Sequence, residues 1–297
     1  MPAAPRPASG ASASQLGWDH LRCPICSQRL QWAQRRLLVC PDGHRFDAAK
    51  QGYFNLLTGR GTAFREDTAE MVAARAEFQT AGHYEPLAAA IAAAVRAHLP
   101  DRPGPAPLRL VDVGAGTGYY LRRVLTAVTH SPAEAVATDI SRYAMRRAAK
   151  IEHTIALVWD VWKPLPLAEA SIDVVLNVFA PRNGTEFARV VRPGGIAVVV
   201  TPQPDHLREV AETLGLLGIA DGKEAAVAER LGQAFAPVAN EEVRSALELT
   251  RADALALAVM GPAGHHLDAE ALRSRLAAGP DVLRTTAAFR VQVLRRG

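Results

Sequence analysis

A glycine-rich turn between an apolar run and a helical pattern constrains the fold of this chain most strongly. The segment L-V-D-V-G-A-G-T-G spans Leu110 to Gly118, and an amphipathic stretch from Tyr120 to Val128 follows it. Glycine lets the backbone turn tightly and approach a ligand closely, and the first turn of a helix offers unpaired N–H groups. The pattern predicts a buried strand that runs into a helix, with a ligand site formed at Gly114, Gly116 and Gly118.

Apolar runs and helical patterns then alternate to the end of the chain. Further strands are predicted at 135–137, 155–158, 172–179 and 196–201, with helices at 142–150, 186–191 and 206–217 between or after them. Alternation with short loops is typical of a parallel sheet covered on both faces. Two late strands at 241–249 and 283–294 flank a helix at 251–259. We therefore expect an α/β, Rossmann-like domain with seven strands, the last pair antiparallel.

An acidic residue supports a nucleoside ligand at this turn. A dinucleotide fingerprint G-x-G-x-x-G requires a third glycine where Tyr119 stands, which weakens the NAD interpretation. Asp139 closes the second predicted strand, where a carboxylate can accept both hydroxyls of a ribose. A tight turn that binds no ligand is the alternative.

Three other residues lie at predicted strand ends, where open α/β sheets bind ligands. Asp160 follows the third strand and could accept from an adenine amino group, or cap a loop. Asn177 and Phe179 end the fourth strand. Taken alone, Asn177 could equally be a hydrogen-bonded polar residue at a strand end, and Phe179 could equally be a core aromatic residue. Their order along one sheet favours the functional interpretation.

All three cysteines lie in a short segment near the start of the chain. Cys23, Cys26, Cys40 and His44 have the spacing C-x2-C-x13-C-x3-H. Thiolates and imidazole are preferred zinc ligands, and four of them complete a closed structural site. A redox C-x2-C motif would need a βα context and would leave Cys40 unexplained. The spacing predicts structural Zn²⁺, and unrelated cysteines near a histidine are the alternative.

The composition argues against a membrane-spanning helix and against a secreted, disulfide-bonded protein. Apolar residues make up 49% of the 297, but no run approaches the roughly 20 residues of a membrane-spanning helix. Three cysteines without an N-terminal signal pattern predict a reducing, cytoplasmic setting. Arginine strongly outnumbers lysine, and its planar fork suits phosphate and stacked bases. The composition is therefore compatible with an acidic partner such as RNA.

These motifs together resemble one enzyme family. V-D-V-G-A-G-T-G, Asp139, Asp160 and the R-P-G-G turn at 192–195 look like the motif series of class I S-adenosylmethionine-dependent methyltransferases. C-P-I-C, Q-G-Y-F-N-L-L, D-T-A-E-M, A-G-H-Y-E-P-L, V-F-A-P and T-P-Q-P-D-H-L follow the order seen in 23S rRNA (guanine-N1)-methyltransferases. The resemblance covers residues from about 21 to 206. The joint G-R-G-T-A-F-R-E at 59–66 departs from the basic linker expected there.

The resemblance implies an activity and a site. It implies methyl transfer from S-adenosylmethionine to N1 of a guanine in a 23S rRNA hairpin loop near the peptide exit tunnel, and one branch of the family confers tylosin-type macrolide resistance. The implied cofactor-binding residues are Asp112, Gly114, Gly116, Gly118, Asp139, Asp160 and Tyr84. Asn177, Phe179 and Asp160 are the catalytic candidates, with Asn177 holding the base edge and Phe179 stacking on it.

We expect four segments and leave two rival functions open. The segments are a disordered tail (1–18), a zinc-binding RNA-recognition module (19–58), a helical linker (59–107) and a methyltransferase domain (108–297). A small-molecule methyltransferase would share the sheet without needing a basic zinc module. A non-enzymatic RNA-binding protein would not need the intact glycine turn. 23S rRNA is the expected partner, no membrane is expected, and a homodimer stays open.

Overall fold

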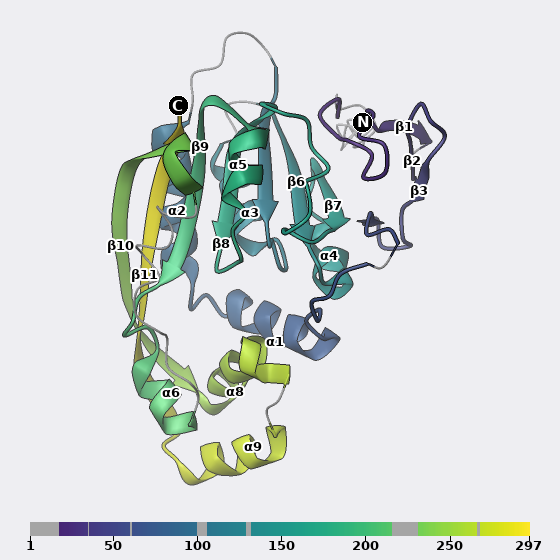
Figure 1. Cartoon of the computed structure of the whole chain (residues 1–297). Helices are drawn as coiled ribbons and strands as arrows, with labels where there is room; N and C mark the ends of the chain where they lie inside the picture. The colour runs from purple at the N-terminus through teal and green to yellow at the C-terminus, as the bar shows by residue number, and fades with distance from the viewer. Residues whose placement is uncertain are drawn as a thin grey trace, which may run out of the picture.

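The central sheet has eight strands. The computed structural model describes residues 18–34, 36–59, 61–99, 106–128, 132–215, 231–265 and 268–297. The strand order is β10-β11-β9-β8-β5-β6-β7-β4 (Figure 1). The strands are β4 (Phe54–Asn55), β5 (Leu108–Val113), β6 (Ala133–Asp139), β7 (Thr154–Val158), β8 (Ile172–Val178), β9 (Val191–Pro202), β10 (Phe235–Thr250) and β11 (Val282–Arg296).

The seven strands expected from the sequence are all present. Strands β5 to β9 pair in parallel, whereas β11 pairs antiparallel with both β9 and β10. Strand β5 lies between β6 and β8. The strands β6 and β7 are therefore added on one side of β5, and β8 and β9 on the other. Ligands of open α/β sheets bind at the carboxyl ends of the strands, next to such a switch in strand order. The R-P-G-G segment, expected as a turn, lies inside β9 instead. The register between β8 and β9 shifts there, so β9 begins early with an irregular stretch.

The eighth strand comes from the N-terminal module. Strand β4 pairs in parallel with β7, with Phe54 opposite Leu157. The rest of the module is a three-stranded antiparallel sheet of β1 (Gln31–Gln34), β2 (Leu37–Val39) and β3 (Arg45–Asp47). Strands β1 and β2 form an antiparallel hairpin in which Trp32 pairs with Leu38.

Helices cover both faces and the carboxyl edge of the main sheet. They are α1 (Ala69–Thr80), α2 (Glu85–His98), α3 (Tyr119–Ala127), α4 (Arg142–Ala148), α5 (Gly184–Val190), α6 (Arg208–Leu214), α8 (Arg251–Met260) and α9 (Ala269–Ala278). Thr68 caps α1, and Thr250 forms a capping box with Asp253 at the start of α8. Helices α1 and α8 pack together below the carboxyl ends of β5 and β8 (Figure 1). The sequence did not lead us to expect α9.

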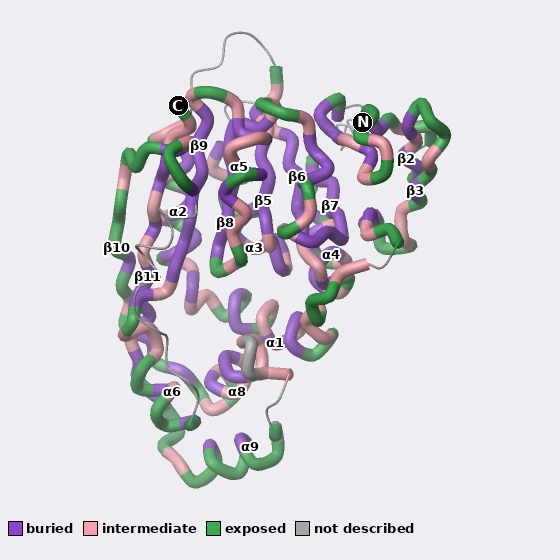
Figure 2. The backbone as a smooth tube through the Cα atoms, in the orientation of Figure 1, coloured by how far each residue is buried: buried purple, intermediate pink, exposed green. Residues whose placement is uncertain are grey.

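The core has one cluster of buried side chains on each face of the sheet. One cluster joins α2, α3 and α4 to the sheet, and the other joins α5 and the zinc module to the opposite face. Figure 2 shows the central strands buried along most of their length and α9 largely exposed. Trp18, at the end of the expected tail, is only 3% exposed and packs in the second cluster. The rest of that tail lies outside the described residues, as does the end of the helix expected at 206–217.

No helix among the described residues is long and apolar enough to span a bilayer.

Candidate active site and zinc centre

The four predicted metal ligands meet at one point. The ligand atoms of Cys23, Cys26, Cys40 and His44 all lie within 4.8 Å of one another. Cys26 Sγ is 3.6 Å from Cys40 Sγ, and His44 Nδ1 is 3.3 Å from Cys40 Sγ. Tetrahedral ligands about 2.3 Å from zinc would be about 3.8 Å apart, so these separations fit one ion. The donor set therefore suits structural Zn²⁺.

The glycine turn has the backbone that its sequence predicts. Gly114, Gly116 and Gly118 all have positive φ, of 78°, 54° and 77°. A Cβ on Gly114 would lie 2.3 Å from the Ala180 Cβ, and one on Gly118 would lie 2.4 Å from the Ile151 Cδ1. Gly114 therefore excludes larger residues through backbone angle and space together, and Gly118 does so mainly through its backbone angle, since the end of the Ile151 side chain can move.

Asp139 and Asp112 lie beside this turn. The Asp139 carboxylate accepts from the Gly116 N–H at 2.9 Å and from the Ser141 N–H at 2.8 Å, which fixes its orientation at the end of β6. Asp112 is 1% exposed, and its Oδ1 has no hydrogen-bond partner within the described residues. Burial, together with the charge of Asp139, raises the pKa of Asp112 to about 8. A carboxyl held this way would ionise readily only beside a cation.

Asp160 faces a segment that crosses the sheet edge. Its carboxylate accepts from the Thr62 hydroxyl at 2.8 Å and from the Trp162 N–H at 3.0 Å. Farther along the same segment, the Ser141 hydroxyl donates to the Asp67 carbonyl, and Glu66 pairs with Arg142. Residues 61–67, which we call the strap, thus cross the ends of β6 and β7. Sequence reasoning gave Asp160 no partner because Thr62 is 98 residues away.

Helix α1 also brings two side chains to the glycine turn. Arg75 pairs with Asp67 at 2.7 Å, donates to the Met260 carbonyl, and lies 3.6 Å from where a Cβ on Gly116 would be. Gln79 accepts from the Thr117 hydroxyl at 2.6 Å. Neither residue carries a recognisable sequence signal, since an arginine or glutamine on an amphipathic helix is usually a solvated residue.

Asn177 and Phe179 adopt different roles at the end of β8. Asn177 is fully buried, and its amide donates to the carbonyls of Val113 at 3.1 Å and Pro181 at 3.0 Å. Its Oδ1 has no partner among the described residues. Phe179 has the left-handed φ of 56° and is 41% exposed. Asn177 therefore holds the turn that presents the Phe179 ring.

Tyr84 belongs to an aromatic group around Phe179. Its ring centroid lies 5.1 Å from Phe289, 6.1 Å from His206 and 6.4 Å from Phe179. Tyr120 lies 6.2 Å from Phe179 and completes the group. The structure therefore places Tyr84 at the β8 end of the site, beside the predicted catalytic residues. His206 was present in the T-P-Q-P-D-H-L motif, but the sequence assigned it no role.

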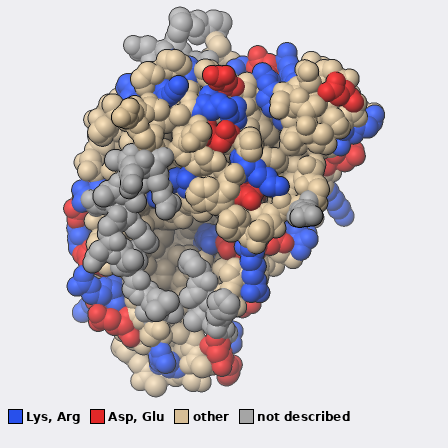
Figure 3. All heavy atoms as spheres, viewed as in Figure 1, with Lys and Arg blue, Asp and Glu red and all other residues tan. Residues whose placement is uncertain are grey.

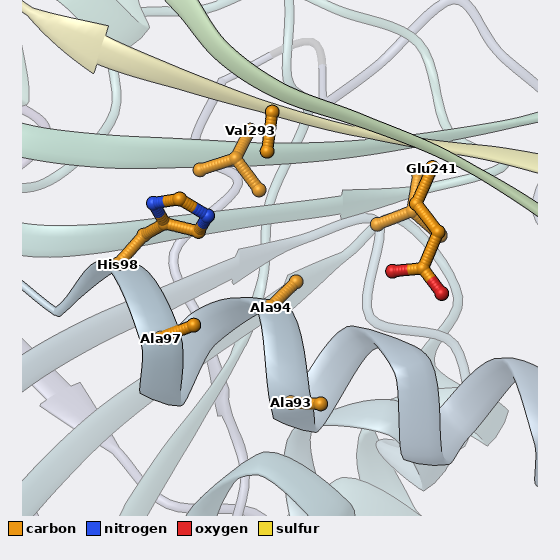
Figure 4. Close-up of a pocket in the computed structure, with 8 residues that line it drawn as sticks. Ala93, Ala94, Ala97, His98, Glu241 and Val293 are labelled. Atoms are coloured by element: carbon orange, nitrogen blue, oxygen red, sulfur yellow. The ribbon is translucent and has the colours of Figure 1, made fainter.

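A hollow marks this region on the surface. Figure 3 shows it in the middle of the face, where Figure 1 has the lower end of β8 above α1 and α8. A separate depression of about 190 Å³ lies between α2 and the β10–β11 pair (Figure 4). It is lined mostly by alanine and valine, with His98 and Glu241 at its rim, and it contains no predicted site residue.

Known proteins match both parts of the chain. Residues 21–59 match a zinc-ribbon family model described as "RlmA, N-terminal", and residues 110–195 match a model described as "Methyltransferase domain". A Streptomyces fradiae protein, named 23S rRNA (guanine(748)-N(1))-methyltransferase, is 43% identical over 278 residues, covering 93% of this chain and 96% of that protein.

The chain belongs to the 23S rRNA (guanine-N1)-methyltransferase family. A Micromonospora griseorubida protein described as a candidate member is 47% identical over 285 residues, covering 92% of this chain and 96% of that protein. A similarly described Bacillus subtilis protein is 31% identical over 205 residues, covering 67% of this chain and 70% of that protein. The family resemblance, the class I methyltransferase fold and the zinc ribbon expected from the sequence are thus confirmed.

Proposed function

We propose that this protein transfers a methyl group from S-adenosylmethionine to N1 of a guanine in a 23S rRNA hairpin loop. The observation that carries the proposal is the match along nearly the whole chain to a protein named for this activity, zinc ribbon and sheet domain included. The macrolide resistance implied by the sequence resemblance would be the physiological consequence. A small-molecule methyltransferase would not account for the zinc ribbon.

The cofactor would lie across the carboxyl ends of β5, β6 and β7. Asp139, held by two backbone N–H groups, would accept the ribose hydroxyls, and the glycine turn would contact the methionine part closely. Asp112 would face the ammonium group. Asp160 would accept from the adenine amino group with the lone pairs that Thr62 and Trp162 leave free. When bound, the sulfonium supplies an electrophilic methyl group.

The target base would lie at the end of β8. Phe179 is the exposed aromatic surface there, and base–aromatic stacking contributes about 1–3 kcal/mol. Asn177 is fully buried, so its contribution would be to keep the Val178–Pro181 turn in place. Positioning of this kind accounts for much of the acceleration in an in-line displacement.

The zinc ribbon would bind the RNA backbone. Its exposed basic side chains on the described surface are Arg29, Arg36, Arg45 and Lys50. Arg36 donates to the Ala49 carbonyl and has a structural contact, whereas Arg22 is half-buried and donates to the carbonyls of Asp19 and Leu21. Arg35, in the same module, lies outside the described residues. Arg29 and Arg45 are therefore the best probes of backbone binding.

The test combines purified protein, labelled cofactor and rRNA hairpins, with mapping of the modified base. We expect one methyl group at guanine N1, which blocks the Watson–Crick edge and stops reverse transcription there. Replacing Arg29 and Arg45 with alanine should weaken hairpin binding and lower its salt dependence by about 0.7 per lost contact. Transfer to small metabolites but not to rRNA would contradict the proposal.

A further inference from the structure

A short hydrogen-bond chain ends on the Tyr84 hydroxyl. The Ala288 N–H donates to His206 Nδ1 at 3.1 Å, and His206 Nε2 lies 3.2 Å from Tyr84 Oη. Because Nδ1 accepts, the proton of the neutral ring is on Nε2, which therefore donates to Tyr84. Burial lowers the pKa of His206 to about 4, against a smaller opposing effect of Asp205, so the ring is neutral at physiological pH.

The Tyr84 hydroxyl is consequently left as an oriented donor. Its oxygen accepts from His206, which is the one hydrogen-bond partner that this hydroxyl has among the described residues. Burial raises the pKa of Tyr84 above its ordinary value, so the hydroxyl keeps its proton. A buried O–H without an acceptor is costly, which indicates that a ligand atom completes the bond.

The surroundings of Tyr84 show which ligand atom this would be. Its ring lies against Phe179, the exposed aromatic at the end of β8. Two further buried polar atoms, Tyr120 Oη and Asn177 Oδ1, have no partner among the described residues in this part of the site. An aromatic surface with several unpaired polar atoms fits a flat, polar base.

We infer that Tyr84 donates a hydrogen bond to O6 of the target guanine, and that His206 is a positioning residue that orients the Tyr84 hydroxyl. This inference rests on the proposed function. Loss of the N1 proton leaves negative charge shared between N1 and O6, and a donor at O6 stabilises that form. N1 then bonds to the methyl carbon while the carbon–sulfur bond breaks, its electron pair stays on sulfur, and the N1 proton is released to solvent.

Several other ionisable groups among the described residues lie near the pair. Asp205 faces His206 and is itself paired with Arg244. Tyr120 interacts electrostatically with Tyr84, and Asp112 and Arg75 are near Tyr120. Burial raises the pKa of Tyr120 well above its ordinary value, so it stays neutral. Asp112 is common to the wild-type protein and to all the variants below, so its titration cancels in each comparison.

Tyr84→Phe tests the donor directly by single-turnover transfer to the rRNA hairpin across a range of pH. Removing a hydrogen bond to a charged acceptor should lower the rate of methyl transfer roughly 10- to 100-fold at neutral pH. The loss should shrink at alkaline pH, where N1 loses its proton without help. Cofactor affinity should not change, which separates this role from the cofactor contact that the sequence resemblance implied for Tyr84.

Two substitutions of His206 separate positioning from packing. In His206→Asn the side-chain oxygen can still accept from the Ala288 N–H but cannot reach Tyr84, so we expect a folded protein with the same pH-dependent loss. In His206→Gln a donor to Tyr84 is restored, and much of the rate should return. Tyr84→Phe combined with His206→Asn should be no slower than Tyr84→Phe alone, because both remove the same interaction.

The outcomes are distinguishable. A wild-type protein that does not methylate the hairpin would overturn the proposed function and this inference with it. Normal wild-type transfer with an equal loss at every pH in Tyr84→Phe would show a structural role and overturn only the inference. Weakened cofactor binding in Tyr84→Phe would place the hydroxyl on the cofactor and also overturn it.

Discussion

The buried Asp112 carboxyl should make the ligand-free protein less stable as pH rises. Its pKa is raised from an ordinary 3.8 to about 8, first by burial and then by the charge of Asp139. Between these two values the folded protein holds a proton that the unfolded chain has lost. Stability is therefore greatest below the lower value and falls as pH rises toward the upper one.

The size of the effect follows from the shift. Each pH unit in this window removes at most about 1.4 kcal/mol, so the loss at pH 7 approaches roughly 4 kcal/mol. In Asp112→Asn the side chain has nearly the same shape as the protonated acid and carries no charge. We expect this variant to be more stable than wild type near pH 7, with little difference near pH 4.

Unfolding in urea at several pH values measures this directly, without cofactor. The matched control is Asp281→Asn, because the Asp281 side chain is 91% exposed and should leave the pH dependence unchanged. The same Asp112→Asn variant should bind S-adenosylmethionine more weakly, since the cofactor's ammonium loses a charged acceptor. Parallel stability curves for wild type and Asp112→Asn would refute the account of a buried, protonated carboxyl.

Three further predictions concern the zinc centre and the cofactor cradle. Protein purified without added metal should contain one zinc per chain by elemental analysis, and Cys26→Ser should lose it while Ser27→Ala keeps it; metal-free wild type would contradict the site. Gly114→Ala should abolish cofactor binding in calorimetry because its Cβ would lie 2.3 Å from Ala180, whereas Gly82→Ala, with a similar positive φ but open space, should only lower stability by about 1–2 kcal/mol. Asp139→Ala should weaken cofactor binding by roughly 1.5–3 kcal/mol per lost hydrogen bond while hairpin binding stays near normal; unchanged cofactor affinity would exclude Asp139 as the ribose acceptor.

Patterns local in the sequence predicted most of the fold. The strands from β5 to β9 each contain an apolar run, β10 and β11 alternate apolar and polar residues over part of their length, and the zinc ligands have a spacing that one ion explains. Strand β4 has two residues, too few for any periodicity. Helix α9 mixes alanine with charged residues and has no clear apolar stripe. Strand β4 is too short, and helix α9 too weakly amphipathic, to be recognised from the sequence.

The site was only partly predictable for a different reason. Gly114, Asp112 and Asp139 share one motif or adjacent strand ends, so topology alone brings them together. The pair of Tyr84 and His206 joins residues 122 positions apart, and Thr62 reaches Asp160 across 98. Such contacts depend on how helices and loops pack, which a single sequence does not specify. The unpaired atoms that support the proposed base site become visible only when the burial of each side chain is known.

The two-residue strand β4 has a consequence for how this protein could have arisen. Recombination between genes usually joins domains at a flexible boundary, and each piece then keeps its own surface. Here a cut between the zinc ribbon and the sheet domain would strip β4 from β7 and leave an open parallel edge, which invites association with other chains. The two parts would therefore be inherited as a unit. Sequence change in the zinc ribbon would be selected for its fit to the sheet as well as for the RNA contact proposed for it.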